Sequence, residues 1–472
     1  MIDFIDPQGI MQLSAIAKAN GHQTFLGILT RENVFKKIEK IKPRVIAYSA
    51  TTGEHKYYLK INEEIKKRFP NIFAIMGGPH VTFYPECIYN STLDAICIGE
   101  GDEAFLELLQ RLERNEDISN IKNIATKEKR NDIRSFYSNL DNLPFPDRDI
   151  FYKTTEMGKF PIKSFMISRG CPYNCTYCFN QPFREMYKGK GSYLRRKSVG
   201  RSIDEIVYVK ERYPIQFVKF YDDIFAYPND AWLEDFCKEY KKKIKLPFHC
   251  LTRPDLFNED MAGLLKEAGC VSISMSIEAA NPYLRNEILK RNMDDEQIYK
   301  AFKICQEYKI NTFANSILAL PNSKIQDDIA TVLMNIKCRV TFAEFPICHP
   351  YPGTPLGEFC RKNSIFDADY DKIHLSYMFE SPLNCFTKRE KKIQKNLSLL
   401  GTVVVWRPRL KNLILNYLIY IPNSIFYILA YILVKMYLIK TKIYPFRLKV
   451  SDFSELFFKG LRIDVFKHSA EV

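Results

Sequence analysis

The chain has 472 residues, of which 46% are hydrophobic and 14% aromatic, so it can bury more than one core and we expect two or three domains. This composition excludes a disordered or fibrous protein. The formal net charge of +14 would concentrate a polyanion near the surface. The lysines are dispersed through helical stretches, however, so solvated helix faces are the favoured interpretation.

Thirteen cysteines would suit a disulfide framework only in a small secreted domain. This chain is long and shows no secretory signal segment, so we expect a reducing, cytoplasmic location. Four of the scattered cysteines lie in apolar patterns and are interpreted as small core residues. They are Cys237, Cys250, Cys270 and Cys305.

Residues 1–125 show the alternating helical and extended patterns of a parallel α/β sheet, and we expect a doubly wound, Rossmann-like (flavodoxin-like) domain there. The expected helices cover residues 10–22, 32–41, 57–69 and 103–112. The expected strands cover residues 24–29, 44–49, 72–76 and 93–98. Residues 126–163 are interpreted as a linker, because the segment 139–151 is rich in proline and aspartate.

A second alternation of strands and helices fills residues 164–375. The expected strands lie in the segments SFMIS, QFVKFYDD, FHCLT, VSISMSIE, FANSILAL and TFAEFPICHP. The expected helices cover residues 203–213, 232–243, 261–267, 297–308 and 325–336. These six βα units predict an open or partial (β/α)6 TIM-type barrel, whose active site lies at the carboxyl ends of the strands.

Residues 376–472 form a hydrophobic region that we expect to be mostly helical. The run 413–434 carries no charge and is long enough to suggest a membrane span, but Asn416 and the turn signal at 422–424 divide it. Basic residues flank both ends, so the charges give no orientation. We expect a helical hairpin that dips into the inner face of a membrane or covers an apolar substrate, and an ordinary buried helix pair has equal weight.

The segment SRGCPYNCTYCFN, residues 168–180, carries Cys171, Cys175 and Cys178 directly after an apolar strand. Thiolates are the ligands of iron–sulfur clusters, and three close cysteines can bind three corners of a cubane. One iron then stays open and can chelate the amino and carboxylate groups of a methionine moiety. A structural zinc site is the main alternative, but it requires a second cysteine pair or histidines, and none follows.

The loop CPYNCTYCF resembles the signature of the radical S-adenosylmethionine (SAM) superfamily. That resemblance implies a [4Fe-4S] cluster, SAM as a cofactor and an external electron donor of flavodoxin or ferredoxin type. It places Phe179 against the adenine of SAM. Tyr177, at a variable position of the signature, is expected to serve packing only.

Polar residues follow several later strands, in FYDDIFA, LTRPD, SMSIEAA, NSILALP and CHPYPGTP. Each alone is more often a helix cap or an ion pair, but the series resembles a subgroup of the superfamily. By that resemblance the residues that bind SAM are Phe179, Asp222, Arg253, Glu278 and Asn315, and the catalytic candidates are His349 and Tyr351. Arg253 or Arg285 can pair with the methionine carboxylate.

Two strand ends in the first domain, AYSATT and AIMGGPHVT, are placed to meet at one edge of the sheet, where α/β proteins bind ligands. Together with LDAICIGEGDEAF they resemble the cobalamin-binding domain of one radical SAM subgroup. The resemblance assigns Ser49, Gly77 and Gly78 to the pocket for the nucleotide tail. The D-x-H-x-x-G motif that supplies an axial imidazole to cobalt is missing, and the N-terminal segment MIDFI is short for a first strand.

The sequence therefore predicts a cobalamin-dependent radical SAM methyltransferase. It would act on an unactivated carbon or phosphorus centre of a small, apolar or lipid-like molecule, through a 5′-deoxyadenosyl radical and methylcobalamin. A radical oxidoreductase or cyclase without methyl transfer is the first alternative. A transfer-RNA-modifying enzyme would account for the charge, but it requires an RNA-binding barrel, so a nucleic-acid partner is not expected. The cysteine triad argues against a non-catalytic cobalamin sensor.

Overall fold

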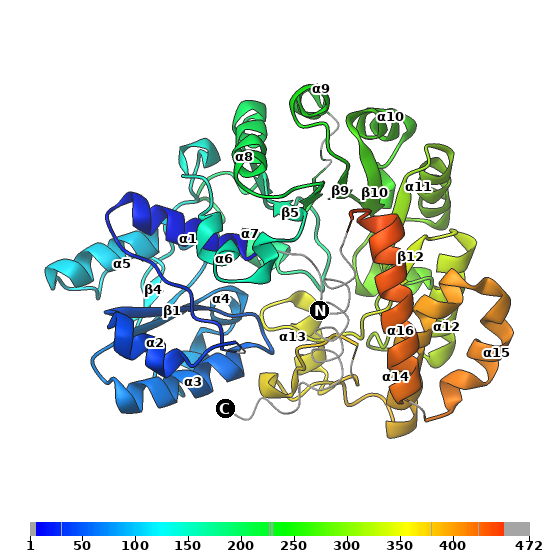
Figure 1. Cartoon of the computed structure of the whole chain (residues 1–472). Coiled ribbons are helices and arrows are strands. Elements are labelled where there is room, and N and C mark those ends of the chain that lie inside the picture. Colours follow the sequence, from blue (N-terminus) through cyan, green and yellow to red (C-terminus); the bar gives the residue numbers. More distant parts are fainter. Residues whose placement is uncertain are drawn as a thin grey trace.

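The structure is a computed structural model that describes residues 6–29, 31–225, 227, 230–378, 380–422 and 424–447. Figure 1 shows two α/β units next to each other, the first in blue and cyan and the second mainly in green, with C-terminal helices in orange beside the second. The N-terminal MIDFI segment and residues 448–472, which the sequence places in the first strand and the C-terminal region, lie outside the described residues.

The first unit is built on a four-stranded sheet. Its strands are β1 (Val45–Ser49), β2 (Phe73–Gly77), β3 (Ala95–Cys97) and β4 (Ile124–Ala125). Its helices are α1 (Gln8–Ala19), α2 (Val34–Ile41), α3 (His55–Arg68), α4 (Pro79–Phe83) and α5 (Asp102–Arg114). The first three strands are parallel and β4 is antiparallel to β3. Ile61 of α3 packs on one face and Leu108 of α5 on the other, so the predicted α/β sheet is confirmed.

Two details of this unit differ from the sequence prediction. The expected strand at 24–29 is absent, because residues 22–28 have no regular structure and none of them is buried. A strand there would have no apolar face to bury against the sheet. The strand order β1-β2-β3-β4 also proceeds without a reversal, so the described strands lack the switch point of a doubly wound sheet.

The second unit is the predicted partial barrel. Its six parallel strands are β5 (Ile162–Phe165), β8 (Phe217–Phe220), β9 (Phe248–Leu251), β10 (Cys270–Ser274), β11 (Asn311–Asn315) and β12 (Phe342–Glu344), paired in that order. Its outer helices are α8 (Val199–Arg212), α9 (Ala231–Lys243), α10 (Glu259–Ala268), α11 (Asp295–Glu307) and α12 (Ile325–Lys337). The four cysteines interpreted as core residues are all buried in this layer. The linker before the barrel contains α6 (Arg148–Tyr152).

The described part of the C-terminal region is mostly helical, as predicted, with α14 (Lys388–Trp406), α15 (Lys411–Asn416) and α16 (Ser424–Leu438). No helix in the described part of the chain is long and apolar enough to cross a membrane. Lys435 of α16 forms an ion pair of 2.7 Å with Glu344 at the end of β12, and the Tyr431 hydroxyl donates to the same carboxylate at 2.5 Å. One side of α16 is therefore fixed to the barrel.

The end of α16 and the residues after it close the barrel at the amino ends of its strands. Ile162, Phe217 and Phe342 are the first residues of β5, β8 and β12, and they pack against side chains of the segment 434–446. Alternate residues of the same strands, such as Val218, pack outward against the helices. The C-terminal segment thus fills the inner face of the half-barrel at the amino ends of the strands. Cofactors must therefore bind at the carboxyl ends of the strands.

Candidate active site

The three cysteines of the C-x3-C-x2-C motif lie in one loop that follows the first barrel strand. A short strand, β6 (Ser168–Arg169), precedes this loop and pairs with β7 (Arg195–Arg196), and helix α7 (Asn180–Met186) follows it. Gly170 has a φ of +94°, and a Cβ atom there would stand 2.5 Å from the Tyr193 carbonyl oxygen. Only glycine therefore fits directly before Cys171.

The cysteine sulfurs lie in a partly buried site with cationic donors beside it. Cys175 is buried, and Cys171 and Cys178 are half-buried. Burial raises the pKa of the Cys171 thiol to about 11 and that of the Cys178 thiol to about 12. Guanidinium groups of Arg253 and Arg291 lie 3.5 Å and 3.7 Å from Cys175 Sγ. Both guanidinium groups can donate hydrogen bonds to this sulfur.

The donor set fits an iron–sulfur cluster. Among the described residues, no three His, Cys, Asp or Glu side chains surround one point closely enough for a single metal ion. A cubane does not require that arrangement, because each thiolate binds a different iron. Three thiolates from one loop would bind three corners of such a cubane and would leave the fourth iron to SAM.

Arg253, which the sequence assigns to SAM, is fixed beside the cluster loop. It donates to the two Asp255 carboxylate oxygens at 2.9 Å and 3.0 Å, and to the Arg291 carbonyl oxygen at 2.7 Å. Its guanidinium carbon stands 3.6 Å from the centroid of the Tyr173 ring. Its Nη1 atom is directed at the cluster loop, and its contact with SAM stays a prediction.

Glu278 belongs to a buried hydrogen-bonded group. The Tyr177 hydroxyl donates to Glu278 Oε1 at 2.6 Å, so the prediction that Tyr177 serves packing alone is wrong. Arg291 Nη1 lies 3.4 Å from the same hydroxyl, and Arg291 Nη2 donates to the Ser276 carbonyl oxygen at 3.0 Å. Burial raises the pKa of Glu278, with Arg291 opposing the shift. A cation-binding group of this kind suits the ammonium or hydroxyl end of SAM.

Arg291 was missed by sequence reasoning, and Arg285 is engaged elsewhere. Arg285 donates to the Met293 carbonyl oxygen at 2.9 Å and to Asp295 at 2.6 Å, within its own loop and helix. The sequence signal for Arg291 was weak, because it is one basic residue in a polar turn whose flanking residues, Lys290 and Asn292, have positive φ. Arg291, rather than Arg285, stands at the cluster loop.

Asp222 holds the strand that leads into the cluster loop. Its Oδ1 atom accepts hydrogen bonds from the Ile167 amide at 2.9 Å and from the Ser168 amide and hydroxyl at 2.6 Å. Burial raises its pKa to about 6. Its Oδ2 atom has no partner among the described residues, so the predicted contact of Asp222 with SAM stays open to test. The neighbouring Asp223 accepts from the Gly170 amide at 3.2 Å.

Phe179 and Asn315 lie on two sides of this site. Phe179 precedes α7 and is 39% exposed, with its ring 6.5 Å from the Phe83 ring of the first unit. Asn315 ends β11, and its carbonyl oxygen accepts from the Glu278 amide at 3.4 Å. The structure thus places Phe179 at the meeting of the two units and Asn315 next to Glu278. Their roles toward SAM stay predictions.

The loop after β12 carries the two catalytic candidates, His349 and Tyr351. His349 is buried, and neither of its ring nitrogens has a hydrogen-bond partner among the described residues. Burial lowers the pKa of His349 to about 4. Directly after this loop, in the first turn of helix α13 (Pro355–Lys362), the Leu356 amide donates to the Thr176 carbonyl oxygen at 2.9 Å, which docks this segment on the cluster loop. A neutral imidazole with free nitrogens is suited to hydrogen-bond a bound molecule.

A cavity of about 400 Å³ lies where the first unit meets the barrel. It is lined on the first unit by Ser49, Gly77 and Gly78, and on the barrel by Met166 and Arg169, among others. The structure therefore brings together the three residues that the sequence predicted for cobalamin. Among the described residues that line the cavity there is no histidine.

The two glycines have different roles in this wall. A Cβ atom at Gly77 would meet nothing nearer than Cys97 Cβ at 3.8 Å, so this position leaves room for a ligand. Gly78 has a φ of +94°, and a Cβ atom there would stand 2.8 Å from the amide nitrogen and the carbonyl oxygen of Ala50. Glycine is therefore required at position 78, because the backbone of Ala50, directly after β1, leaves no room for a side chain.

Known families match both units. The family described as the Radical SAM superfamily matches residues 165–333, and the B12 binding domain matches residues 4–109. The chain belongs to the radical SAM superfamily. Its first unit is a B12-binding domain, and its cofactors are a [4Fe-4S] cluster, SAM and cobalamin.

Individual proteins are similar over most of this radical SAM chain. An uncharacterized methyltransferase of Pyrococcus horikoshii is 29% identical over 348 residues, which cover 71% of this chain and 73% of that protein. An anaerobic magnesium-protoporphyrin IX monomethyl ester cyclase of Rubrivivax gelatinosus is 24% identical over 405 residues, covering 80% and 69%. The solved structure of the cobalamin-dependent SAM radical enzyme OxsB, with aqua-cobalamin and SAM bound, has a TM-score of 0.64 at 14% identity, covering 99% of this chain and 80% of OxsB. That likeness shows a common fold.

Three partly buried ion pairs join the B12-binding domain of this radical SAM enzyme to the strands β6 and β7 beside its cluster loop. Asp102 accepts from Arg169 Nη1 and Nη2 at 2.8 Å and 3.0 Å. Glu100 lies 3.2 Å from Arg169 and 2.6 Å from Arg195. Burial alone would raise the pKa of Asp102, but the charge of Arg169 outweighs it and holds that pKa below its ordinary value. Arg169 stands two residues before Cys171, so these pairs connect the cavity to the cluster.

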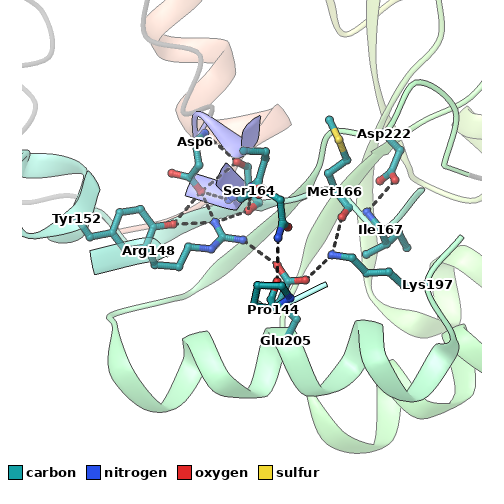
Figure 2. A network of polar contacts seen from close by, with 12 residues as sticks. Asp6, Pro144, Arg148, Tyr152, Ser164, Met166, Ile167, Lys197, Glu205 and Asp222 are labelled. Atoms are coloured by element: carbon teal, nitrogen blue, oxygen red, sulfur yellow. Dashed lines mark hydrogen bonds and ion pairs between the residues drawn. The ribbon is translucent and has the colours of Figure 1, made fainter. Parts of the chain in front are cut away.

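A buried polar network supports the barrel wall of the cavity (Figure 2). Arg148 of the linker donates to Asp6 at 2.8 Å and to Glu205 at 3.2 Å. Glu205 also accepts from Lys197 at 2.6 Å, and Lys197 donates to the Met166 carbonyl oxygen at 3.1 Å. Figure 2 shows Lys197 directed toward both partners. Since Met166 and Lys197 line the cavity, the network fixes one wall before a cofactor binds.

Proposed function

We propose that this radical SAM enzyme is a cobalamin-dependent methyltransferase that acts on an unactivated carbon or phosphorus centre. The observation that carries the proposal is the position of the cavity. Met166, Ser168 and Arg169 line it, and Cys171 follows two residues later in the same chain segment. A corrinoid in the cavity and SAM at the cluster would therefore share one reaction space at the carboxyl ends of the strands.

When bound, the cluster supplies the electron that cleaves SAM to a 5′-deoxyadenosyl radical, and cobalamin supplies the methyl group. The chain's residues bind and orient these groups. Arg253 and Arg291 donate to Cys175 Sγ and hold this side chain in the cluster loop. Glu278 offers a carboxylate to SAM, and Gly77 leaves the cavity wall open to the corrinoid.

His349 is the residue we assign to the substrate. Its buried imidazole has two unpaired nitrogens, so it can accept one hydrogen bond and donate another. With a pKa lowered to about 4, it is neutral at physiological pH. It can therefore orient a substrate hydroxyl by accepting its hydrogen bond, and Tyr351 stands beside it at a ring distance of 6.0 Å.

The proposed substrate is a small, apolar or lipid-like molecule, and the electron comes from an external flavodoxin- or ferredoxin-type donor. We also propose a cytoplasmic location. All thirteen cysteines are free, which is compatible with a reducing compartment. The relative with a methyltransferase name is more similar in sequence than the cyclase, at 29% against 24% identity.

A radical cyclase or oxidoreductase without methyl transfer is the second candidate, favoured by the similarity to the magnesium-protoporphyrin ester cyclase. The two functions differ in what happens to the methyl group of SAM. A methyltransferase releases S-adenosylhomocysteine as well as 5′-deoxyadenosine, whereas a cyclase releases 5′-deoxyadenosine alone.

The test uses the full chain, reconstituted without oxygen with iron, sulfide and hydroxocobalamin. The enzyme is then reduced with titanium citrate and given SAM that carries a deuterated methyl group. Methyl transfer predicts deuterated methylcobalamin and S-adenosylhomocysteine by mass spectrometry, even without the substrate. Formation of 5′-deoxyadenosine with an unlabelled corrinoid and no S-adenosylhomocysteine would exclude the methyltransferase and leave the cyclase.

A further inference from the structure

The positive charge of the chain is concentrated in one stretch. Residues 391–451 contain eleven lysines and arginines and no aspartate or glutamate. The other 411 residues carry 58 basic and 55 acidic side chains, so they are close to neutral. Solvated helix faces spread along the chain therefore do not account for the charge, and the C-terminal region is the part that would attract an anionic partner.

The same region holds most of the strongly exposed apolar side chains. In the described part of the chain, nine large apolar side chains are at least half exposed. Six of the nine belong to α15, α16 and the residues between them, and we call these six the C-terminal apolar face. They are Leu413, Tyr417, Ile425, Phe426, Leu433 and Tyr437. Such a concentration marks an interaction surface, since single exposed apolar residues are ordinarily scattered.

On α16 the exposed positions form a stripe. Phe426, Leu433 and Tyr437 are 68%, 56% and 50% exposed, and steps of seven and four residues place them on one side of the helix. Tyr431 and Val434 on the other side are buried. Because Tyr431 and Lys435 bind Glu344, the helix cannot rotate to hide the stripe.

Basic side chains stand at the C-terminal end of the α16 stripe. The Tyr437 ring lies 5.8 Å from the Trp406 ring, and Arg407 stacks on Trp406 at 3.6 Å. Arg407 is therefore held near the end of the stripe, and Lys440 and Lys442 follow α16 directly. A helix with an apolar stripe and basic residues around it is the pattern of an interfacial membrane helix.

We propose that the C-terminal apolar face docks this enzyme on an anionic membrane surface. The stripe of α16 inserts at the headgroup level, and the basic residues pair with lipid phosphates. A folded RNA would pair with the basic residues, but it would not bury the exposed isoleucine, leucine and phenylalanine side chains. A lipid surface accounts for both the positive charge and the exposed apolar side chains. Figure 1 shows α15 and α16 on the side of the barrel away from the first unit, so docking leaves the cavity uncovered.

The test measures co-sedimentation of the purified full chain with vesicles. One set contains phosphatidylcholine alone, and the other contains equal parts of phosphatidylcholine and phosphatidylglycerol. We expect binding to the anionic set that weakens as salt is added. The double variant Ile425→Ser, Phe426→Ser should bind at least about tenfold more weakly, since each inserted apolar side chain contributes about a factor of ten or more.

Matched control variants show whether vesicle binding depends on the C-terminal apolar face or on any exposed aromatic ring or lysine. Phe25→Ser with Tyr89→Ser removes two equally exposed aromatic rings of the first unit, and it should bind vesicles like the wild type. Lys440→Gln with Lys442→Gln should weaken binding to anionic vesicles about thirtyfold. Lys238→Gln with Lys242→Gln, on the exposed side of α9, should not. Thermal unfolding and the cluster absorbance verify that each variant is folded.

Three results would overturn the proposal. The first is equal vesicle binding by the wild type and the folded Ile425→Ser, Phe426→Ser variant. The second is a wild type that binds neither vesicle set but changes from dimer to monomer, by light scattering, when this face is altered. The third is binding of a generic RNA duplex, lost in the lysine variant, without any binding to vesicles.

Discussion

The pair formed by Asp102 and Arg169 provides the sharpest test of how the two units are held together. Asp102→Asn keeps the shape of the side chain but removes the charge that faces Arg169 across 2.8 Å and 3.0 Å. Breaking a buried pair costs roughly 3–5 kcal/mol. Glu100 remains 3.2 Å from Arg169 and keeps part of the attraction. We therefore expect the substitution to cost about half of that free energy, roughly 2 kcal/mol. This cost shifts the equilibrium between docked and undocked units about thirtyfold.

The assay follows unfolding in urea with two probes. Both tryptophans, Trp232 and Trp406, lie in the barrel and the C-terminal helices, so their fluorescence reports the second half of the chain. Circular dichroism reports both units. The two transitions should coincide in the wild type and separate in Asp102→Asn, because the B12-binding domain would then unfold first. Iron content should stay unchanged, while affinity for hydroxocobalamin falls roughly thirtyfold, since a corrinoid in the cavity would contact both units.

Glu103→Gln is the matched control, because Glu103 is the next acid in the first turn of α5 and lies 3.8 Å from Arg134 on the surface. It should keep coincident transitions and normal corrinoid affinity. Arg169→Gln closes a double-mutant cycle with Asp102→Asn, and the double variant should cost less than the sum of the single ones. Coincident transitions in Asp102→Asn, with corrinoid affinity equal to that of Glu103→Gln, would refute the reasoning.

Four further predictions concern single residues. Gly77→Leu should abolish corrinoid binding, measured by absorbance, without changing the urea midpoint of unfolding. Gly78→Ala should lower the free energy of unfolding by about 2 kcal/mol, because Gly78 has a positive φ and a Cβ atom there would contact Ala50. His349→Gln should change stability by less than about 1 kcal/mol but reduce product formation roughly a hundredfold, with normal cluster content. Burial raises the pKa of Asp328 to about 7, above its unfolded value of about 3.9. Stability should therefore fall as pH rises from about 4 to 7, by at most about 1.4 kcal/mol per unit, and Asp328→Asn should flatten that slope in urea titrations.

Each of these has an opposite outcome that would count against the structure. Normal corrinoid binding in Gly77→Leu would move the cofactor out of the cavity. Full product formation by His349→Gln would remove His349 from the substrate site. An unchanged pH slope in Asp328→Asn would mean that this carboxyl is ionised in the folded chain.

The common loop of the three cysteines and the common cavity wall of Ser49 and Gly77 could be predicted because their signals are local, while the binding roles of these residues stay predictions. The C-x3-C-x2-C spacing lies within one loop, and Ser49 and Gly77 follow neighbouring parallel strands whose carboxyl ends must meet at one edge. The six barrel strands could also be predicted from their apolar patterns. In each case the sequence pattern and the contact lie in the same or in adjacent elements.

Contacts between distant segments could not be predicted in the same way. Asp102 and Arg169 are separated by 67 residues, and nothing in either motif indicates that they pair. Arg291 lies in a turn, and its position beside Cys175 depends on how the barrel closes. The apolar run near residue 430 was visible, but hydropathy does not tell which side of α16 packs on the strands and which stays exposed.

The central claim is that the corrinoid and the cluster meet at one reaction space between the two units. The most direct measurement is electron paramagnetic resonance of the reconstituted enzyme, with the cluster reduced and the cobalt in its divalent state. We predict a cobalt signal broadened by the neighbouring cluster spin, and an unbroadened signal in Cys175→Ala, which keeps the corrinoid but loses the cluster. An identical, unbroadened cobalt signal in both proteins would contradict the account.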